Sequence, residues 1–158
     1  GRRPAARRWA MTAAAAPHML LITSADSSYP GADTVGQMHL SYTTDTSIIR
    51  VPDPVMLPEH FYLDCLRKGF DGIVVMSSGA ECPFEGSYPK LAKRLDALTL
   101  RLKRRNTDPR RITRCAICTV CANSFIKEVK NMASLLEEIG PLDRQALSFD
   151  LQASGGTA

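Results

Sequence analysis

The chain has 158 residues, of which 44% are hydrophobic and 23% are charged, as is typical of a single domain with a full core. No apolar run reaches the roughly 18 residues that cross a bilayer, so we expect no membrane span. The formal net charge of +4 comes from arginines within residues 1–16, and the remaining residues are neutral overall. The five cysteines are too few and too clustered for a secreted disulfide scaffold, and their odd number leaves one unpaired, so we expect a reducing cytoplasm.

The predicted organisation has three parts. Residues 1–16 are rich in arginine and alanine, lack apolar periodicity and are expected to be a disordered leader. This leader superficially resembles a transit peptide, but we interpret it as an extension of the chain. Residues 17–142 are expected to form one domain, and residues 143–158 a C-terminal tail.

The first half of the domain alternates between strand and helix patterns. Residues 19–23 form a short apolar run typical of a strand, and residues 31–39 are expected to form a short helix. Residues 47–51 form a second, β-branched strand. A helix is predicted to begin at Pro58 and to end at Gly69.

The second half repeats the alternation. Residues 73–76 are expected to form the third strand, followed by a long helix whose leucines recur at helical spacing from Leu91 to Leu102. Residues 112–117 are expected to form the fourth strand. An amphipathic helix follows and ends at Gly140.

Strands that alternate with helices require crossover connections, which place the strands parallel and the helices on both faces. The sequence therefore predicts a small doubly wound α/β fold, of Rossmann or flavodoxin type, with a four-stranded parallel sheet. Every loop after a strand then lies at the carboxyl edge of the sheet. This rim would gather residues 24–31, 53–58, 77–86 and 118–121.

The cysteines are the first candidate site. Cys115, Cys118 and Cys121 form a Cys-x-x-Cys-x-x-Cys run, and Cys82 is expected on the same rim. Together these four thiols could ligate an iron–sulfur cluster, of the 2Fe–2S or 4Fe–4S type, or a zinc ion. In the alternative interpretation Cys115 is a core residue, because strand side chains alternate between faces, and Cys118 and Cys121 are reactive thiols at a helix N-terminus. Cys65 lies on an apolar helix face and is expected in the core.

Other functional patterns are weak or missing. Residues 90–114 are strongly basic but lack interleaved aromatic residues, so we expect a solvated face or an acidic protein partner and no nucleic acid. No dinucleotide fingerprint, phosphate loop or nucleophile elbow occurs in the sequence. The chain is therefore not expected to have an active site of its own.

Several motifs between residues 19 and 141 carry a resemblance to a known family. They are Ser-Tyr-Pro-Gly-Ala-Asp (28–33), Ile-Ile-Arg-Val-Pro (48–52), Arg-Lys-Gly-Phe-Asp-Gly-Ile-Val-Val (67–75), Glu-Cys-Pro-Phe-Glu-Gly-Ser-Tyr (81–88) and Leu-Leu-Glu-Glu-Ile-Gly-Pro (135–141). In these segments the chain resembles the iron–sulfur delta subunit of methyl-viologen-reducing hydrogenases. The resemblance implies a two-iron cluster that passes electrons to a flavoprotein, with ligands from the first three rim loops.

The chain departs from the family pattern at the cluster. Residues 24–27 stand where the pattern has Cys-x-x-Cys, Asp53 stands where a cysteine follows Arg-Val-Pro, and Ser77 or Ser78 replaces another cysteine. Only Cys82 remains of the family's ligand set. Because thiolate is the usual ligand of such clusters, the family's cluster is expected to be absent.

The resemblance implies an electron-transfer or assembly role within an anaerobic redox complex of several subunits. The chain would link a hydrogenase, formate dehydrogenase or similar module to a heterodisulfide-reductase-like flavoprotein. Two alternatives remain open. One is a structural adaptor without a cluster, and the other is a switch in which Cys118 and Cys121 form a reversible disulfide or bind zinc.

Overall fold

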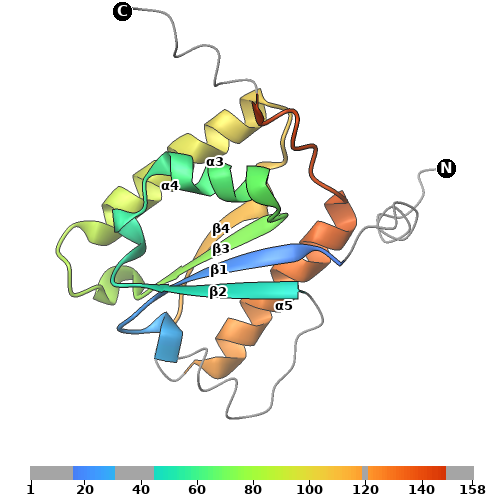
Figure 1. The fold of residues 1–158 in the computed structure, drawn as a ribbon. Helices are drawn as coiled ribbons and strands as arrows, with labels where there is room; N and C mark the ends of the chain where they lie inside the picture. The colour runs from blue at the N-terminus through green and yellow to red at the C-terminus, as the bar shows by residue number, and fades with distance from the viewer. Residues whose placement is uncertain (1–15, 31–44, 119–120, 149–158) are drawn as a thin grey trace, which may run out of the picture.

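Four strands form one parallel sheet in the order β2-β1-β3-β4 (Figure 1). The computed structural model describes residues 16–30, 45–118 and 121–148. The strands are β1 (His18–Ser24), β2 (Asp45–Val51), β3 (Gly72–Ser77) and β4 (Ile112–Ala116). All four predicted strands are thereby confirmed. The predicted helix at 31–39 and most of the predicted leader and tail lie outside the described residues.

The three long predicted helices are also present, as α3 (Glu59–Lys68), α4 (Ser87–Arg104) and α5 (Ala122–Ile139). Gly69 ends α3 with φ of 136°, a conformation that L side chains rarely adopt, and Gly140 follows α5. Three short 3₁₀ helices were not predicted: η1 (Pro54–Met56), η2 (Gly79–Glu81) and η3 (Pro109–Arg111).

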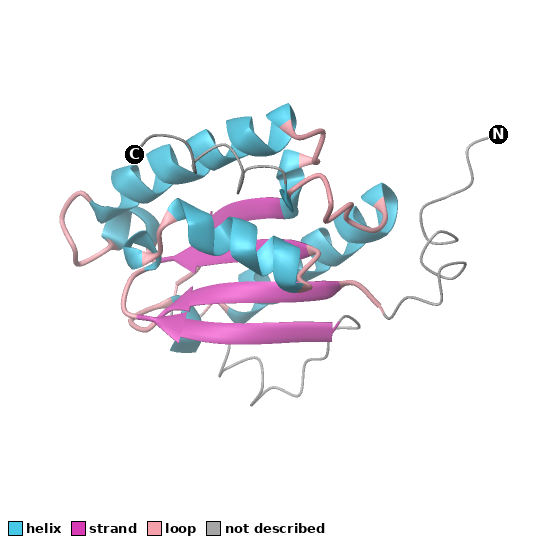
Figure 2. Ribbon diagram, turned by 45° about the horizontal axis from the view of Figure 1, so that its top comes forward, coloured by secondary structure: helices cyan, strands magenta, loops and turns pink. Residues whose placement is uncertain are grey.

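Helices cover both faces of the sheet, which confirms the doubly wound α/β fold (Figure 2). On one face, Leu20 and Ile73 pack with the leucines of α3 and α4. On the other face, Leu21 and Val74 pack against α5. The central strands β1 and β3 are buried on both faces, and this explains their continuous apolar sequence. None of the helices in the described parts of the chain combines the length and the hydropathy of a membrane span.

The strand order reverses between β1 and β3. From β1 the chain proceeds outward to β2, whereas from β3 it proceeds to β4 on the opposite side. In parallel sheets of this kind, ligands bind at the carboxyl ends of the strands beside such a switch point. The loops after β1, β3 and β4 are therefore the first places to look for a site.

The chain continues to pack on the domain after α5. Leu147 is fully buried in the core beneath α3 and α4, and Leu142 is 8% exposed in the same core. The Arg67 side chain donates a hydrogen bond to the Leu147 carbonyl at 2.9 Å. Residues 143–148 of the predicted tail thus lie against the domain, and residues 149–158 lie outside the described part of the chain.

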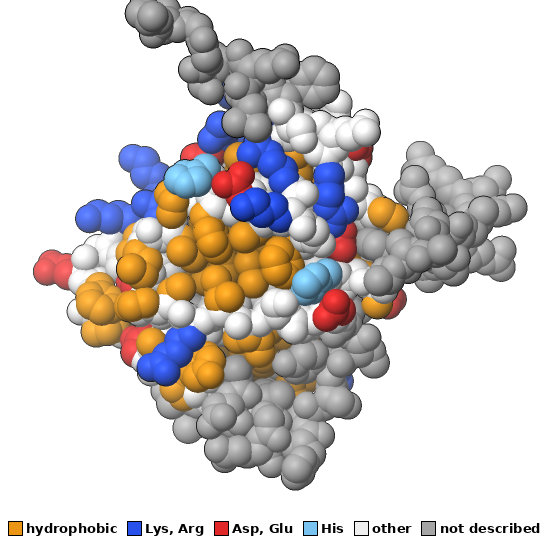
Figure 3. Space-filling view, viewed as in Figure 1, with side chains coloured by type: hydrophobic (Ala, Val, Ile, Leu, Met, Phe, Trp, Pro, Cys, Tyr) orange, Lys and Arg blue, Asp and Glu red, His pale blue; other side chains and the backbone are white. Residues whose placement is uncertain are grey.

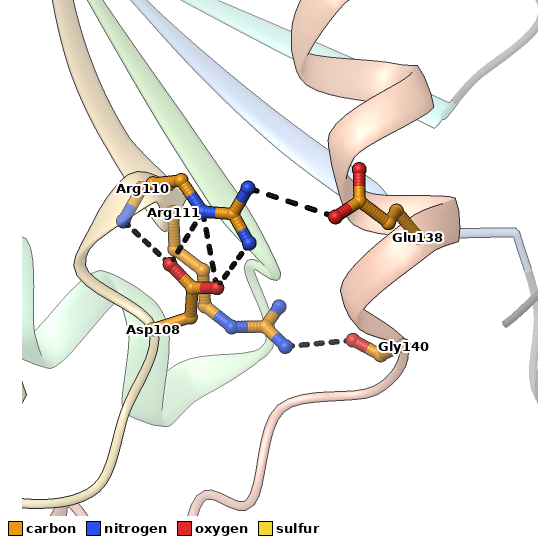
Figure 4. A network of polar contacts seen from close by, with 5 residues as sticks. All are labelled: Asp108, Arg110, Arg111, Glu138 and Gly140. Carbon is orange, nitrogen blue, oxygen red and sulfur yellow. Dashed lines mark hydrogen bonds and ion pairs between the residues drawn. The ribbon is translucent and has the colours of Figure 1, made fainter. Parts of the chain in front are cut away.

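A buried arginine connects three segments at the amino edge of the sheet (Figure 4). Arg111 is 4% exposed and donates to the Asp71 carbonyl at 3.0 Å and to the Gly140 carbonyl at 2.6 Å. Burial lowers the pKa of this guanidinium, and the carboxylates of Asp71 and Asp108 oppose that effect. Arg111 therefore holds the end of α5 against the start of β3.

The neighbouring arginine lies in a different environment. Arg110 forms ion pairs with Asp108 at 2.8 Å and with Glu138 at 3.6 Å, and more than half of its side chain is exposed (Figure 4). Solvent screens such pairs, so Arg110 is expected to contribute less to stability than Arg111 does.

Arg111→Met is expected to lower the free energy of unfolding by about 1–3 kcal/mol, because it leaves buried carbonyl oxygens without a donor. Urea denaturation measures the change. Arg110→Met is the matched control, and it should shift the denaturation midpoint much less. Equal effects of the two substitutions would contradict the role assigned to Arg111.

Candidate functional site

The first rim loop contains a buried cluster of hydroxyl groups. The Ser24 and Ser27 hydroxyls are 2.8 Å apart, and the Ser28 hydroxyl donates to the Met76 carbonyl at 2.9 Å. The Ser28 oxygen also accepts the Ser24 amide at 2.7 Å. These bonds connect the loop to β3. Ser24 and Ser27, which stand where the family pattern has Cys-x-x-Cys, are therefore hydrogen-bonded to each other.

Asp53 is the central polar residue of the second rim loop. It is 7% exposed and caps η1 by accepting the Val55 amide at 2.9 Å. Its other carboxylate oxygen accepts hydrogen bonds from the Ser87 hydroxyl and, at 3.3 Å, from the Cys82 thiol. Asp53 thus joins the loop after β2 to the segment that opens α4.

A second buried layer adjoins this loop. The Arg94 guanidinium donates to the carbonyls of Val55 and Leu57, which fixes the second rim loop against α4. Tyr62 on α3 is fully buried, and its hydroxyl has no hydrogen-bond partner among the described residues. Burial raises the pKa of Tyr62 to about 12, with Arg94 opposing the shift. No sequence pattern indicated this layer, because its residues are far apart in the chain.

Cys118 and Cys121 are joined by a disulfide between β4 and α5, with Cα atoms 5.2 Å apart. The Cys121 amide donates to the Cys118 carbonyl at 3.2 Å. Cys121 occupies the N-cap position of α5 but makes no side-chain capping bond, and the first turn of α5 contains no acidic residue. This arrangement leaves the positive end of the helix dipole beside the disulfide.

The disulfide lies in the wall of a cavity of about 370 Å³. The cavity is lined by residues from the loops after β1, β3 and β4, namely Ser27, Ser78, Ala80, Glu81, Ala116, Ile117, Cys118 and Cys121. It therefore lies at the switch point of the sheet, as expected for a ligand site in this fold class.

The four candidate cysteines lie in three different surroundings. Cys82 lines a neighbouring cavity of about 470 Å³, and Ala80 lines both cavities. Cys115 is partly buried against the core under α5, which agrees with the alternative interpretation of this residue. Burial, with a smaller contribution from Glu128, raises the pKa of Cys115 to about 12. A thiol in this environment is unreactive at neutral pH.

The fifth cysteine lies on the other face of the sheet. Cys65 is partly buried against the core of α3 and α4, as predicted. Burial raises the pKa of this thiol as well, with a smaller contribution from Asp64. Cys65 therefore belongs to the packing of α3.

The residues present do not fit the family's two-iron cluster. One thiol, Cys82, stands at the family's ligand positions, and its neighbours Asp53 and Ser87 are hydrogen-bonded to each other. The sulfurs of Cys118 and Cys121 are bonded to one another and not free to bind a metal in this state. In the described parts of the chain, no three His, Cys, Asp or Glu side chains gather as a metal site. A shared site of the four cysteines stays a prediction.

The basic residues of the α4 region make internal contacts. Arg101 pairs with Glu59 at 2.8 Å, and the Arg114 guanidinium lies 5.5 Å from the centroid of the Tyr88 ring. Arg94 and Arg111 bind backbone carbonyls, as described above. Much of the local positive charge therefore stabilises the fold.

Comparison with known proteins identifies relatives of two kinds. The family described as methyl-viologen-reducing hydrogenase, delta subunit, matches residues 19–140. The A component of the ferredoxin:CoB-CoM heterodisulfide reductase of Methanosarcina mazei is 29% identical over 81% of this chain. The D-type iron–sulfur protein of the vhu F420-non-reducing hydrogenase of Methanopyrus kandleri is 28% identical over 72% of it.

The two kinds of relative differ in length. The chain spans 16% of the Methanosarcina mazei protein but 87% of the Methanopyrus kandleri protein. The corresponding iron–sulfur protein of Archaeoglobus profundus is covered to a similar extent, 92%, at 24% identity. The family match covers most of this chain, including nearly all of the four strands. The chain belongs to the methyl-viologen-reducing hydrogenase delta subunit family.

Proposed function

We propose that this chain is an assembly component of a redox complex of several subunits, and that it docks through its carboxyl rim on a heterodisulfide-reductase-like flavoprotein. The proposed location is the cytoplasm, in agreement with the cysteine content. The chain would hold a hydrogenase, formate dehydrogenase or similar module beside that flavoprotein. Three observations support this proposal.

The first observation is the dual occurrence of the module among the relatives. It corresponds to nearly the whole iron–sulfur protein in Methanopyrus kandleri and to a small part of the heterodisulfide reductase A component in Methanosarcina mazei. A domain that occurs both inside a longer chain and as a separate protein is expected to keep its contacts with the rest of that chain. A protein like the heterodisulfide reductase A component is therefore the proposed partner.

The second observation carries the proposal: apolar side chains are exposed on three rim loops. Tyr29 follows β1 and is 38% exposed, Met56 follows β2 and is 59% exposed, and Phe84 follows β3 and is 52% exposed. Figure 3 shows hydrophobic side chains over the face that carries α3 and towards the left edge. Aromatic and methionine side chains are enriched at protein interfaces, so the rim fits a docking surface.

The third observation concerns the ligand positions of the family. In this chain they hold hydroxyl and carboxylate groups whose hydrogen bonds stabilise the rim loops. Such a rim keeps the shape of the docking face without thiolates for a cluster. The geometry therefore favours the adaptor role over electron relay through the family's cluster.

Phe84→Asp is expected to weaken binding to the heterodisulfide reductase A component of the same organism by at least about tenfold, because it places a charge in an apolar interface. Isothermal titration calorimetry on the full chain measures the affinity. Leu100→Asp is the matched control, because Leu100 is 57% exposed on α4, away from the rim. If both variants bind as tightly as the unsubstituted chain, the rim is not the docking face.

Anaerobically purified protein is expected to contain iron, acid-labile sulfide and zinc only in substoichiometric amounts. Elemental analysis and the visible absorption spectrum measure the content. Cys82→Ser is the informative variant, because Cys82 is the thiol remaining at the family's ligand positions. Stoichiometric iron in the unsubstituted chain that is lost in Cys82→Ser would contradict the adaptor role and restore electron relay.

A further inference from the structure

Docking through the rim requires neither the Cys118–Cys121 disulfide nor the cavity beside it. The Cys118–Cys121 disulfide and the cavity beside it lie at the switch point of the sheet, where ligands of this fold class bind. Both sulfur-bearing residues line the cavity. A disulfide needed only for stability would gain nothing from a position at a binding cavity. The two observations together indicate chemistry with a small molecule.

We propose that this cavity is a thiol-binding site in which the Cys118–Cys121 disulfide exchanges with a small, positively charged thiol. This function goes beyond docking and does not depend on it. The site would carry two electrons by sulfur exchange in a chain whose rim lacks the thiolates of the family's cluster.

The class of thiol follows from the charged side chains around the cavity. Glu81 is the charged residue among those lining it, and the nearby Ser78 hydroxyl donates to the Asp26 carboxylate at 3.2 Å. The described lining residues include no lysine, arginine or histidine. Carboxylates attract an ammonium group and repel a carboxylate or sulfonate. An aminothiol therefore fits the site better than an acidic thiol of the same length.

The position of α5 decides which sulfur is attacked. Cys121 packs against the core and occupies the N-cap of α5, whose first turn has no side-chain cap and no acid. Helix N-termini stabilise thiolates, and the more stable thiolate is the better leaving group. The incoming thiolate is therefore expected to attack Cys118 Sγ and to release the Cys121 thiolate.

The exchange balances with two thiols per disulfide. The first thiolate forms a mixed disulfide with Cys118, and the electron pair of the broken S–S bond remains on Cys121. The thiolate of a second small thiol then attacks the mixed disulfide at the sulfur that came from the first small thiol, and Cys118 is released as a thiolate. Two thiols are oxidised to one disulfide, both cysteines are reduced, and the two protons of the thiols pass to Cys118 and Cys121.

The experiment compares three small thiols acting on the oxidised full-length chain: cysteamine, 2-mercaptoethanol and 3-mercaptopropionate. Samples are quenched with acid and alkylated, and mass spectrometry measures the fraction of reduced protein over time. Each rate of reduction is divided by the concentration of the thiolate. Cysteamine is expected to react about tenfold faster than 3-mercaptopropionate. In Glu81→Gln this preference should shrink, whereas Glu85→Gln, outside the cavity lining, should keep it.

Peptide mapping of the first cysteamine adduct gives a second readout, and the adduct is expected on Cys118. In Cys121→Ser, cystamine is expected to leave a stable mixed disulfide on Cys118, because no resolving thiol remains. The proposal is overturned if the folded disulfide resists all three thiols. It is equally overturned if their relative rates match those of the urea-unfolded chain, which has no cavity. The thiol series on the unsubstituted chain decides between these outcomes even if a variant fails to fold.

Discussion

The parallel alignment of the four strands is the constraint on which the rest of the structure depends. Because every strand runs the same way, the loops after β1, β2, β3 and β4 all reach one edge of the sheet. That edge brings together residues from 24 to 121 that share no local sequence relation. The hydroxyl cluster, the Asp53 network and the disulfide cavity are separate consequences of this one arrangement.

Asp53 shows how the rim loops are hydrogen-bonded to one another. A buried carboxylate is costly unless it is hydrogen-bonded, and this one accepts bonds from the Val55 amide, the Cys82 thiol and the Ser87 hydroxyl. At the position where the family pattern has a cysteine, the chain therefore gains a structural bond in place of a metal ligand. The apolar side chain of Phe84 remains exposed near this polar centre, so the rim stays suited to contact with a protein.

Most of the fold could be predicted from the sequence because its signals are local. The β-branched run of β2, the leucine spacing of α4 and the glycine after α5 each act within one element. The site was less predictable. Strand alternation favoured one of two open interpretations of Cys115, a core position, and the structure shows this residue partly buried against the core. No local pattern could show that Ala80 lines both the cavity of Cys82 and the cavity of the disulfide. The contact of Asp53 with Ser87, 34 residues away, depends on the assembled sheet.

The rim loops are held by hydrogen bonds among their own side chains, and we expect this rim to hold no metal. A crystal structure of anaerobically purified protein, with anomalous scattering measured at the iron and zinc edges, tests it directly. We expect no anomalous peak beside Cys82, Asp53 and Ser78, and we expect a hydrogen bond between Asp53 and Ser87. An iron peak within bonding distance of Cys82 Sγ would overturn the claim and would make the chain an electron carrier of the family's usual type.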